Sequence, residues 1–231
     1  MVLYCFVCHN EVYELAADRI NAMMTRLASA DYIIATGGHE NESFLESERR
    51  LCLASGDAYE HLPSKVVAMY SYIASAPDFN RYSSIVKLDY DMVLHRLINT
   101  EELEPNHYMG EVYSLEGDRT WHMGKCSINS PWNDTPYDGP FVPFCLGGYG
   151  YILSRKAMTI LTSNRTKEAA TLAIYEDVFV ALTLSEQQIQ ACQWSANLSS
   201  AVSSPDHLET QAELFPTKKT LLQKLKNLLH L

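Results

Sequence analysis

The segment 84–94, Ser-Ile-Val-Lys-Leu-Asp-Tyr-Asp-Met-Val-Leu, is predicted to be a buried β-strand that ends in two carboxylates. Its nearly continuous apolar residues are typical of a strand covered on both faces of a parallel sheet. Open α/β sheets bind ligands beyond the carboxyl ends of their strands. We therefore expect Asp89 and Asp91 at that edge, where their hard oxygen donors suit Mn²⁺ or Mg²⁺.

A second pair of acids, Glu176 and Asp177, lies inside the apolar segment 174–182. Burying a carboxylate is costly unless it is paired, hydrogen-bonded or bound to a metal. The pair therefore indicates either a functional site or the start of a helix, where the helix dipole favours negative charge. Both interpretations can hold together.

The size and charge of the chain limit its function. It has 231 residues, 47% of them hydrophobic, which fits one large α/β domain or two small ones, and we expect one. A formal net charge of −10 and the lack of a basic and aromatic cluster argue against nucleic acid as a partner.

The sequence has no apolar run of membrane-spanning length and no signal-peptide pattern, so we expect a cytoplasmic location. Asn-x-Ser/Thr sequons would instead fit a secretory lumen if the chain is a fragment of a longer protein.

Strand and helix patterns alternate along the chain, which predicts an α/β layer fold. The segments 2–8 and 31–36 are predicted strands. A helix is predicted from about 11 to 28, with Asn10 as its N-cap, and a second helix over 62–74.

The segment 106–144 is rich in Gly, Pro, Asn, Asp and aromatic residues, which predicts loops and short strands around a site. Gly147 and Gly148 follow it and are candidate cofactor-binding residues, because glycine lets the backbone approach a ligand closely. Tight turns that lead into a strand are the alternative explanation for these glycines. Ser154 is predicted to cap a helix over 155–161.

Several motifs occur in one order between roughly residues 50 and 190. They are Asp57-x-Tyr59-x-x-Leu62-x-x-Lys65, Lys87-Leu88-Asp89-Tyr90-Asp91, Tyr108-Met109-Gly110, Arg119, Lys125, Pro136-Tyr137, Gly147-Gly148-x-Gly150-Tyr151-x-Leu153-Ser154 and Glu176-Asp177-Val178. In this order they resemble the β1,3-glycosyltransferases related to animal β1,3-galactosyltransferases and Fringe. Many members have three consecutive acids where this chain has Asp89-Tyr90-Asp91, so the middle acid is replaced.

The resemblance implies a fold of the GT-A type, with a mixed, mostly parallel central sheet flanked by helices. It implies a single nucleotide-sugar-binding domain over residues 1–204, in which about 1–95 bind the nucleotide and about 96–204 bind the acceptor. The residues 205–231 would form a C-terminal tail.

The resemblance also implies an inverting transfer of a hexose or N-acetylhexosamine from a UDP-sugar to a glycan hydroxyl, with a β1,3 linkage. Asp91 would bind a metal on the donor diphosphate, and Asp89 would contact the ribose or the water shell of the metal. Asp177, next to Glu176, would be the general base.

Other residues are candidates by position alone. His9 and Asn10 follow the first strand, where a nucleotide can rest at the sheet edge. Lys65 and Lys87 either face the diphosphate or serve as charge partners. His207 is either a third metal ligand or a solvated loop histidine.

Three aromatic side chains in the loop-rich segment, Trp121, His122 and Trp132, either stack on sugar faces or fill space beneath the loops. The segment 218–231 has leucines and lysines at helical spacing, which predicts an amphipathic helix. That helix either packs on protein or lies on an anionic membrane surface, which would suit a lipid-linked glycan acceptor.

Two other functional classes fit the same acids. One is a non-catalytic glycan-binding or nucleotide-binding module of the same fold. The other is a metal-dependent nucleotidyltransferase, which also uses carboxylates at a strand end. A nucleotidyltransferase should release pyrophosphate, whereas a glycosyltransferase should release UDP.

Overall fold

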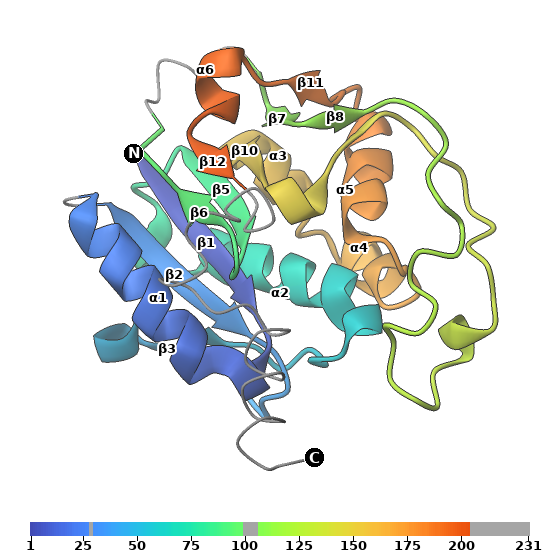
Figure 1. Ribbon diagram of the computed structural model, residues 1–231, viewed down its shortest axis with the longest axis horizontal. Helices are drawn as coiled ribbons and strands as arrows, with labels where there is room; N and C mark the ends of the chain where they lie inside the picture. Colours follow the sequence, from blue (N-terminus) through green and yellow to red (C-terminus); the bar gives the residue numbers. More distant parts are fainter. Residues whose placement is uncertain (28–29, 99–105, 204–231) are drawn as a thin grey trace, which may run out of the picture.

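The computed structural model describes residues 1–27, 30–98 and 106–203 (Figure 1). The strands of this part of the chain are β1 Val2–Cys8, β2 Asp31–Thr36, β3 Ser43–Leu45, β4 Arg50–Cys52, β5 Ser84–Asp89, β6 Val93–Leu94, β7 Tyr108–Gly110, β8 Val112–Tyr113, β9 Phe144–Cys145, β10 Tyr151–Ser154, β11 Cys192–Gln193 and β12 Val202–Ser203. Its α-helices are α1 Tyr13–Arg26, α2 Leu62–Ser75, α3 Arg155–Ile160, α4 Asn164–Ala170, α5 Glu176–Ser185 and α6 Ala196–Ser199. The predicted tail and His207 lie outside the described residues.

One mixed sheet forms the centre of the fold. Within the described residues its strand order is β11-β7-β10-β5-β1-β2-β4-β3. β1 pairs in parallel with both β2 and β5, whereas β10 is antiparallel to β5 and β7, and β3 is antiparallel to β4. The prediction of a mixed, mostly parallel sheet flanked by helices in an α/β domain is confirmed.

The central strands are buried on both faces. Along β1, Leu3, Cys5 and Val7 belong to the core shared with α2, α3 and α5, while the alternate residues Tyr4, Phe6 and Cys8 belong to the core shared with α1. Side chains of a strand point alternately to its two faces, so a strand covered on both sides must be apolar throughout. Figure 1 shows α1 on one face of the sheet and α2 on the other.

The strand and helix predictions hold closely at the N-terminal half. The two predicted strands coincide with β1 and β2, and α2 matches the predicted second helix. The prediction that Asn10 caps the first helix is wrong, because α1 begins at Tyr13 and Asn10 lies in the short 3-10 helix η1 Asn10–Val12. The backbone N–H of Asn10 instead donates to Asp57 Oδ2 at 2.7 Å. This long-range contact replaces the local cap.

Two further local predictions can be compared with the structure. Ser154 caps α3 as expected, since its Oγ accepts a hydrogen bond from the N–H of Ala157 at 3.2 Å. The segment 106–144 contains only short strands and a 3-10 helix between loops. No helix within the described part of the chain is long and apolar enough to span a membrane.

The strands that follow β1 in the sequence are added first on one side of β1 and then on the other. From β1 the chain passes through α1 to β2 on one side, and after α2 it returns to β5 on the other side of β1. Connections that leave adjacent parallel strands in opposite directions open a crevice at the carboxyl ends of those strands. His9 follows β1 and Asp89 ends β5, so these two residues lie at this edge of the sheet.

Gly150→Ala is expected to destabilise the fold by about 3 kcal/mol. Gly150 has φ +87°, and a Cβ there would lie 2.6 Å from Leu88 Cδ2 and 2.7 Å from the carbonyl oxygen of Lys87. Chemical denaturation would measure the loss. Gly148→Ala is the matched control, because a Cβ at Gly148 meets no atom within 4 Å, and a similar loss in both variants would contradict the prediction.

Candidate functional site

Lys87 lies on β5 with its ammonium group inside the protein, and its side chain is only 1% exposed. The Nζ atom lies 2.7 Å from Asp89 Oδ1, 3.1 Å from the carbonyl oxygen of Gly147 and 3.3 Å from Glu176 Oε2. Burial lowers the pKa of Lys87, but the two carboxylates raise it more, so the pKa lies above its usual value. Lys87 is therefore a buried cation between the two acid pairs.

Glu176 is the buried member of the second acid pair, with 4% of its surface exposed. Its Oε1 accepts a hydrogen bond from the Tyr151 hydroxyl, which in turn accepts one from the Tyr70 hydroxyl at 2.9 Å. Burial raises the pKa of Glu176, although Lys87 opposes this shift. The side chain is held by protein groups on both oxygens, which suits support of the site more than contact with a substrate.

Asp177 stands at the start of α5, where the sequence also predicted a helix N-terminus. Its Oδ2 accepts a hydrogen bond from the N–H of Gly147 at 3.1 Å, and its Oδ1 accepts one from the N–H of Val178 at 2.9 Å. Burial raises the pKa of Asp177 and outweighs the backbone donors, which lower it. A carboxylate with a raised pKa is a stronger proton acceptor than an ordinary aspartate.

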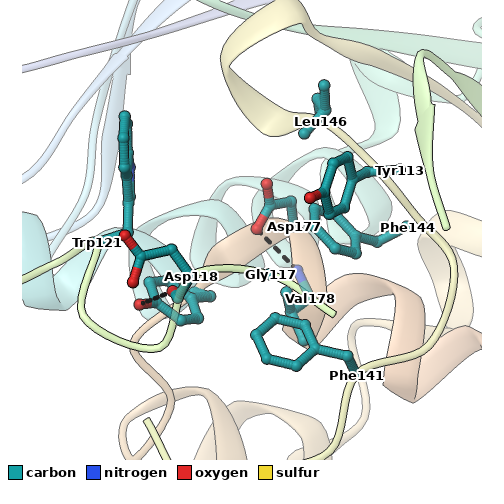
Figure 2. Close-up of a pocket in the computed structure, with 10 residues that line it drawn as sticks. Tyr113, Gly117, Asp118, Trp121, Phe141, Phe144, Leu146, Asp177 and Val178 are labelled. Carbon is teal, nitrogen blue, oxygen red and sulfur yellow. Dashed lines mark hydrogen bonds between the residues drawn. The ribbon is translucent and has the colours of Figure 1, made fainter. Parts of the chain in front are cut away.

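Asp177 lines a cavity of about 310 Å³. The wall consists mainly of aromatic and aliphatic side chains with two carboxylates; its residues are Tyr113, Gly117, Asp118, Trp121, Phe141, Phe144, Leu146, Tyr175, Asp177 and Val178. Figure 2 shows the carboxylate of Asp177 among these side chains, with Trp121 standing apart on the other side of the space. Such a cavity suits a sugar ring, which has apolar faces and polar edges.

The three aromatic candidates of the loop-rich segment have different surroundings. Trp121 lines the cavity and is 61% exposed. His122 is fully buried, with Nδ1 2.8 Å from the Tyr175 hydroxyl and Nε2 2.9 Å from the carbonyl oxygen of Thr135. Trp132 packs edge-on against the His122 ring. Of the three, only Trp121 is placed to meet a ligand in this cavity.

Asp57 contacts both the loop that follows β1 and the loop that follows β2. Its Oδ1 pairs with Lys65 Nζ at 2.6 Å, its Oδ2 accepts from Asn10, and its carbonyl oxygen lies 2.8 Å from His9 Nδ1. Burial raises the pKa of Asp57, but hydrogen bonds from Lys65 and Asn10 lower it further, so the pKa lies below its usual value. Lys65 is buried, and its ammonium group forms an ion pair with the Asp57 carboxylate.

Asp57 is a site residue that was not predicted from the sequence. The signal was present, because Asp57 and Lys65 belong to the same motif at the start of α2. The structure brings His9, Asn10 and Lys65 together around Asp57: Asn10 and Lys65 bond its carboxylate, and His9 bonds its backbone carbonyl oxygen.

The two candidate glycines lie in the 3-10 helix η7 Gly147–Tyr149, which leads into β10. A Cβ at Gly147 would lie 2.7 Å from Glu176 Oε2, so a larger residue would displace the acid pair. Gly148 has open space at its Cβ position. The close approach at Gly147 is therefore to the acids of α5.

Asp91 follows Asp89 in the turn after β5, and its carbonyl oxygen accepts a hydrogen bond from Arg19. Burial and the neighbouring charge of Asp89 raise the pKa of Asp91. Within residues 1–27, 30–98 and 106–203, no cluster of three or more His, Cys, Asp or Glu is arranged to hold a metal ion. Two carboxylates separated by one residue, Asp89 and Asp91, still fit Mg²⁺ or Mn²⁺, because such ions commonly take their other ligands from phosphate and water. The third predicted ligand, His207, lies outside the described residues.

A comparison with protein-family models matches residues 50–194 to the family described as Galactosyltransferase. The chain belongs to the galactosyltransferase family. The matched region contains both acid pairs, the glycines of η7 and the residues lining the cavity. Membership indicates a glycosyltransferase, an enzyme class that uses a sugar donor and a glycan acceptor.

Comparison with solved structures adds a more distant likeness for this family member. A structure titled "Crystal Structure of A197 from STIV" aligns with 84% of this chain and 82% of that chain, at 15% sequence identity and a TM-score of 0.43. No curated protein matches the chain in sequence.

Proposed function

We propose that this protein is an inverting glycosyltransferase that moves a hexose or N-acetylhexosamine from a UDP-sugar to a glycan hydroxyl, with a β1,3-linked product. The observation that carries the proposal is the position of Asp177. It lies in an aromatic cavity and is bonded to Gly147, whose carbonyl oxygen contacts the same ammonium group as Asp89. A base beside an acceptor cavity is thus linked directly to the donor edge of the sheet.

The proposed reaction is a single displacement at the anomeric carbon of the donor. The Asp177 carboxylate accepts the proton of the acceptor hydroxyl as its oxygen forms a bond to that carbon. The bond between the anomeric carbon and the diphosphate oxygen breaks, and its electron pair leaves with UDP. Attack from the side opposite the leaving group inverts the configuration.

The donor would lie at the edge of the sheet where β1 and β5 end. His9 and Asn10 would contact the nucleoside, since Asp57 and Lys65 fix their loop at this edge. Asp89 and Asp91 would hold Mn²⁺ or Mg²⁺, and a bound cation would neutralise the charge that develops on the diphosphate.

The acceptor would occupy the cavity beside Asp177. The rings of Trp121, Phe141 and Tyr113 offer surfaces on which the apolar face of a sugar can stack. Asp118 can accept a hydrogen bond from a second hydroxyl at the edge of the same cavity.

Trp121→Ala is expected to raise the acceptor KM about fivefold to tenfold with little change in kcat, because it removes one stacking surface. Initial rates over a range of acceptor concentrations would measure this. Ile128→Ala is the control, since Ile128 is highly exposed on the same loop and does not line the cavity. An unchanged acceptor KM in Trp121→Ala would place the acceptor elsewhere.

As pH is lowered, the transfer rate is expected to fall already at a pH above the usual pKa of an aspartate. Asp177 must be deprotonated to act as a base, and burial raises its pKa, so activity is lost as pH falls through that raised value. A pH profile of kcat under saturating substrates would show the limb. An acid limb at the pKa of an exposed aspartate would argue against Asp177 as the base.

The proposal is tested by UDP release from a panel of UDP-sugars, with Mn²⁺, with Mg²⁺ and with EDTA, in the presence and absence of glycan acceptors. Metal-dependent UDP release from one sugar is the expected result. Release of pyrophosphate would indicate a nucleotidyltransferase. UDP-sugar binding without release under any condition would indicate a binding module.

A further inference from the structure

One buried ammonium group joins three segments of the candidate site. Lys87 belongs to β5, Gly147 to η7 and Glu176 to α5. An ammonium group has three N–H donors and no acceptor. Nζ donates hydrogen bonds to Asp89 Oδ1 at 2.7 Å and to the carbonyl oxygen of Gly147 at 3.1 Å, and it forms an ion pair with Glu176 Oε2 at 3.3 Å.

Gly147 connects this cation to the proposed base. The carbonyl oxygen of its peptide unit contacts Lys87, and its own N–H donates to Asp177 Oδ2. Gly147 packs closely against α5, since a Cβ there would lie 2.7 Å from Glu176 Oε2. Glu176 is fixed in turn by the hydroxyl of Tyr151.

We propose that Lys87 is a positioning residue that holds the proposed base Asp177 and the donor-side carboxylate Asp89 in a fixed relation, through Gly147 and Glu176. This role rests on the proposed glycosyl transfer. In that reaction the donor edge and the base must be aligned, since the acceptor oxygen attacks opposite the leaving diphosphate. A displacement of about 1 Å at a reacting group can reduce the rate a hundredfold.

Burial of this charge favours a geometric role. Replacing a buried ion pair with apolar residues of similar volume is often neutral or stabilising, so stability alone does not require a lysine here. The Lys87 side chain is 1% exposed, which leaves it no direct contact with a substrate at the surface. Its effect on transfer must pass through the groups it bonds.

Lys87→Met is expected to lower kcat by about a hundredfold and to change the donor KM by much less. The matched control is Lys65→Met, which removes the other buried ammonium group, the one paired with Asp57. Because Lys65 stands on the donor side, its loss should act mainly on the donor KM. A donor KM effect in Lys87→Met with kcat intact would overturn the proposal.

Lys87→Arg separates position from charge. The guanidinium group keeps the positive charge, but its planar fork cannot reproduce the contacts that one nitrogen makes with Asp89, Gly147 and Glu176. We expect this variant to fold with near wild-type stability and to keep kcat at least about tenfold below wild type. Full recovery of both stability and kcat would show that only the charge matters, and would overturn the positioning role.

Hydrogen exchange gives a readout that does not depend on turnover. The segment 145–151 should exchange about tenfold faster in Lys87→Met than in Lys65→Met at equal global stability, because the bond to Gly147 is lost. Equal exchange in the two variants would overturn the proposal. If the wild-type protein released no UDP at all, the proposed function would fail, and this comparison would still decide whether Lys87 positions the segment.

Discussion

Asp177→Asn is expected to reduce sugar transfer by about a hundredfold or more, with donor affinity near that of the wild type. The amide cannot accept the proton of the acceptor hydroxyl. Its oxygen can still accept one of the two backbone hydrogen bonds, from Gly147 or Val178, so the start of α5 should keep its structure. Single-turnover rates and calorimetric titration with UDP would measure the two quantities separately.

Asp118→Asn is the matched control, because it removes the other carboxylate from the same cavity. The Oδ1 atom of Asp118 already accepts hydrogen bonds from the N–H and the hydroxyl of Thr120, at 2.8 and 2.7 Å, which lower its pKa. A low pKa makes a poor proton acceptor at neutral pH. We expect less than a tenfold loss of kcat, and the reverse order of effects would assign the base to Asp118.

Asp91→Ala is expected to weaken metal-dependent UDP binding by about tenfold to a hundredfold and to remove the difference between Mn²⁺ and EDTA. In the wild type, burial and then repulsion from the Asp89 carboxylate raise the pKa of Asp91. A divalent cation relieves that repulsion. Removing one carboxylate should therefore cost the protein most of its affinity for the cation. Titration with UDP in Mn²⁺ and in EDTA would test this.

Asp78→Ala is the control for a simple loss of negative charge. Asp78 is exposed in the 3-10 helix Pro77–Phe79, which precedes β5 and lies away from its carboxyl end. UDP affinity should be unchanged there. Manganese dependence that survives in Asp91→Ala would place the metal elsewhere.

Much of the fold could be predicted because its elements carry strong local patterns. β1 is apolar on both faces and β5 is nearly so, which is typical of strands covered on two sides, and α2 repeats its apolar residues at helical spacing. The start of α1 could not be predicted in the same way. Asn10 is a good cap by composition, but Asp57, far away in the sequence, binds its backbone N–H.

The acidic residues of the candidate site and their order along the chain could be predicted from the sequence. The different environments of these acids could not. Glu176 and Asp177 are adjacent in sequence, yet one is enclosed by Lys87 and Tyr151 and the other faces the cavity. Helical residues one position apart point in different directions, so adjacency does not make them equivalent. Trp121 and His122 separate in the same manner, one into the cavity and one into the core.

The sequence by itself determined the class of fold, the strand that delivers Asp89, and the helix whose first turn holds Glu176 and Asp177, because hydrophobic period and local chemistry fix these features over short distances. Tertiary structure alone decided which groups meet. Lys87 and Gly147 are 60 positions apart in the chain, and no local pattern indicates that the ammonium group of Lys87 bonds the carbonyl oxygen of Gly147. That pairing arises only when β5, η7 and α5 pack together, since burying an ammonium group is stable only where several acceptors converge on it.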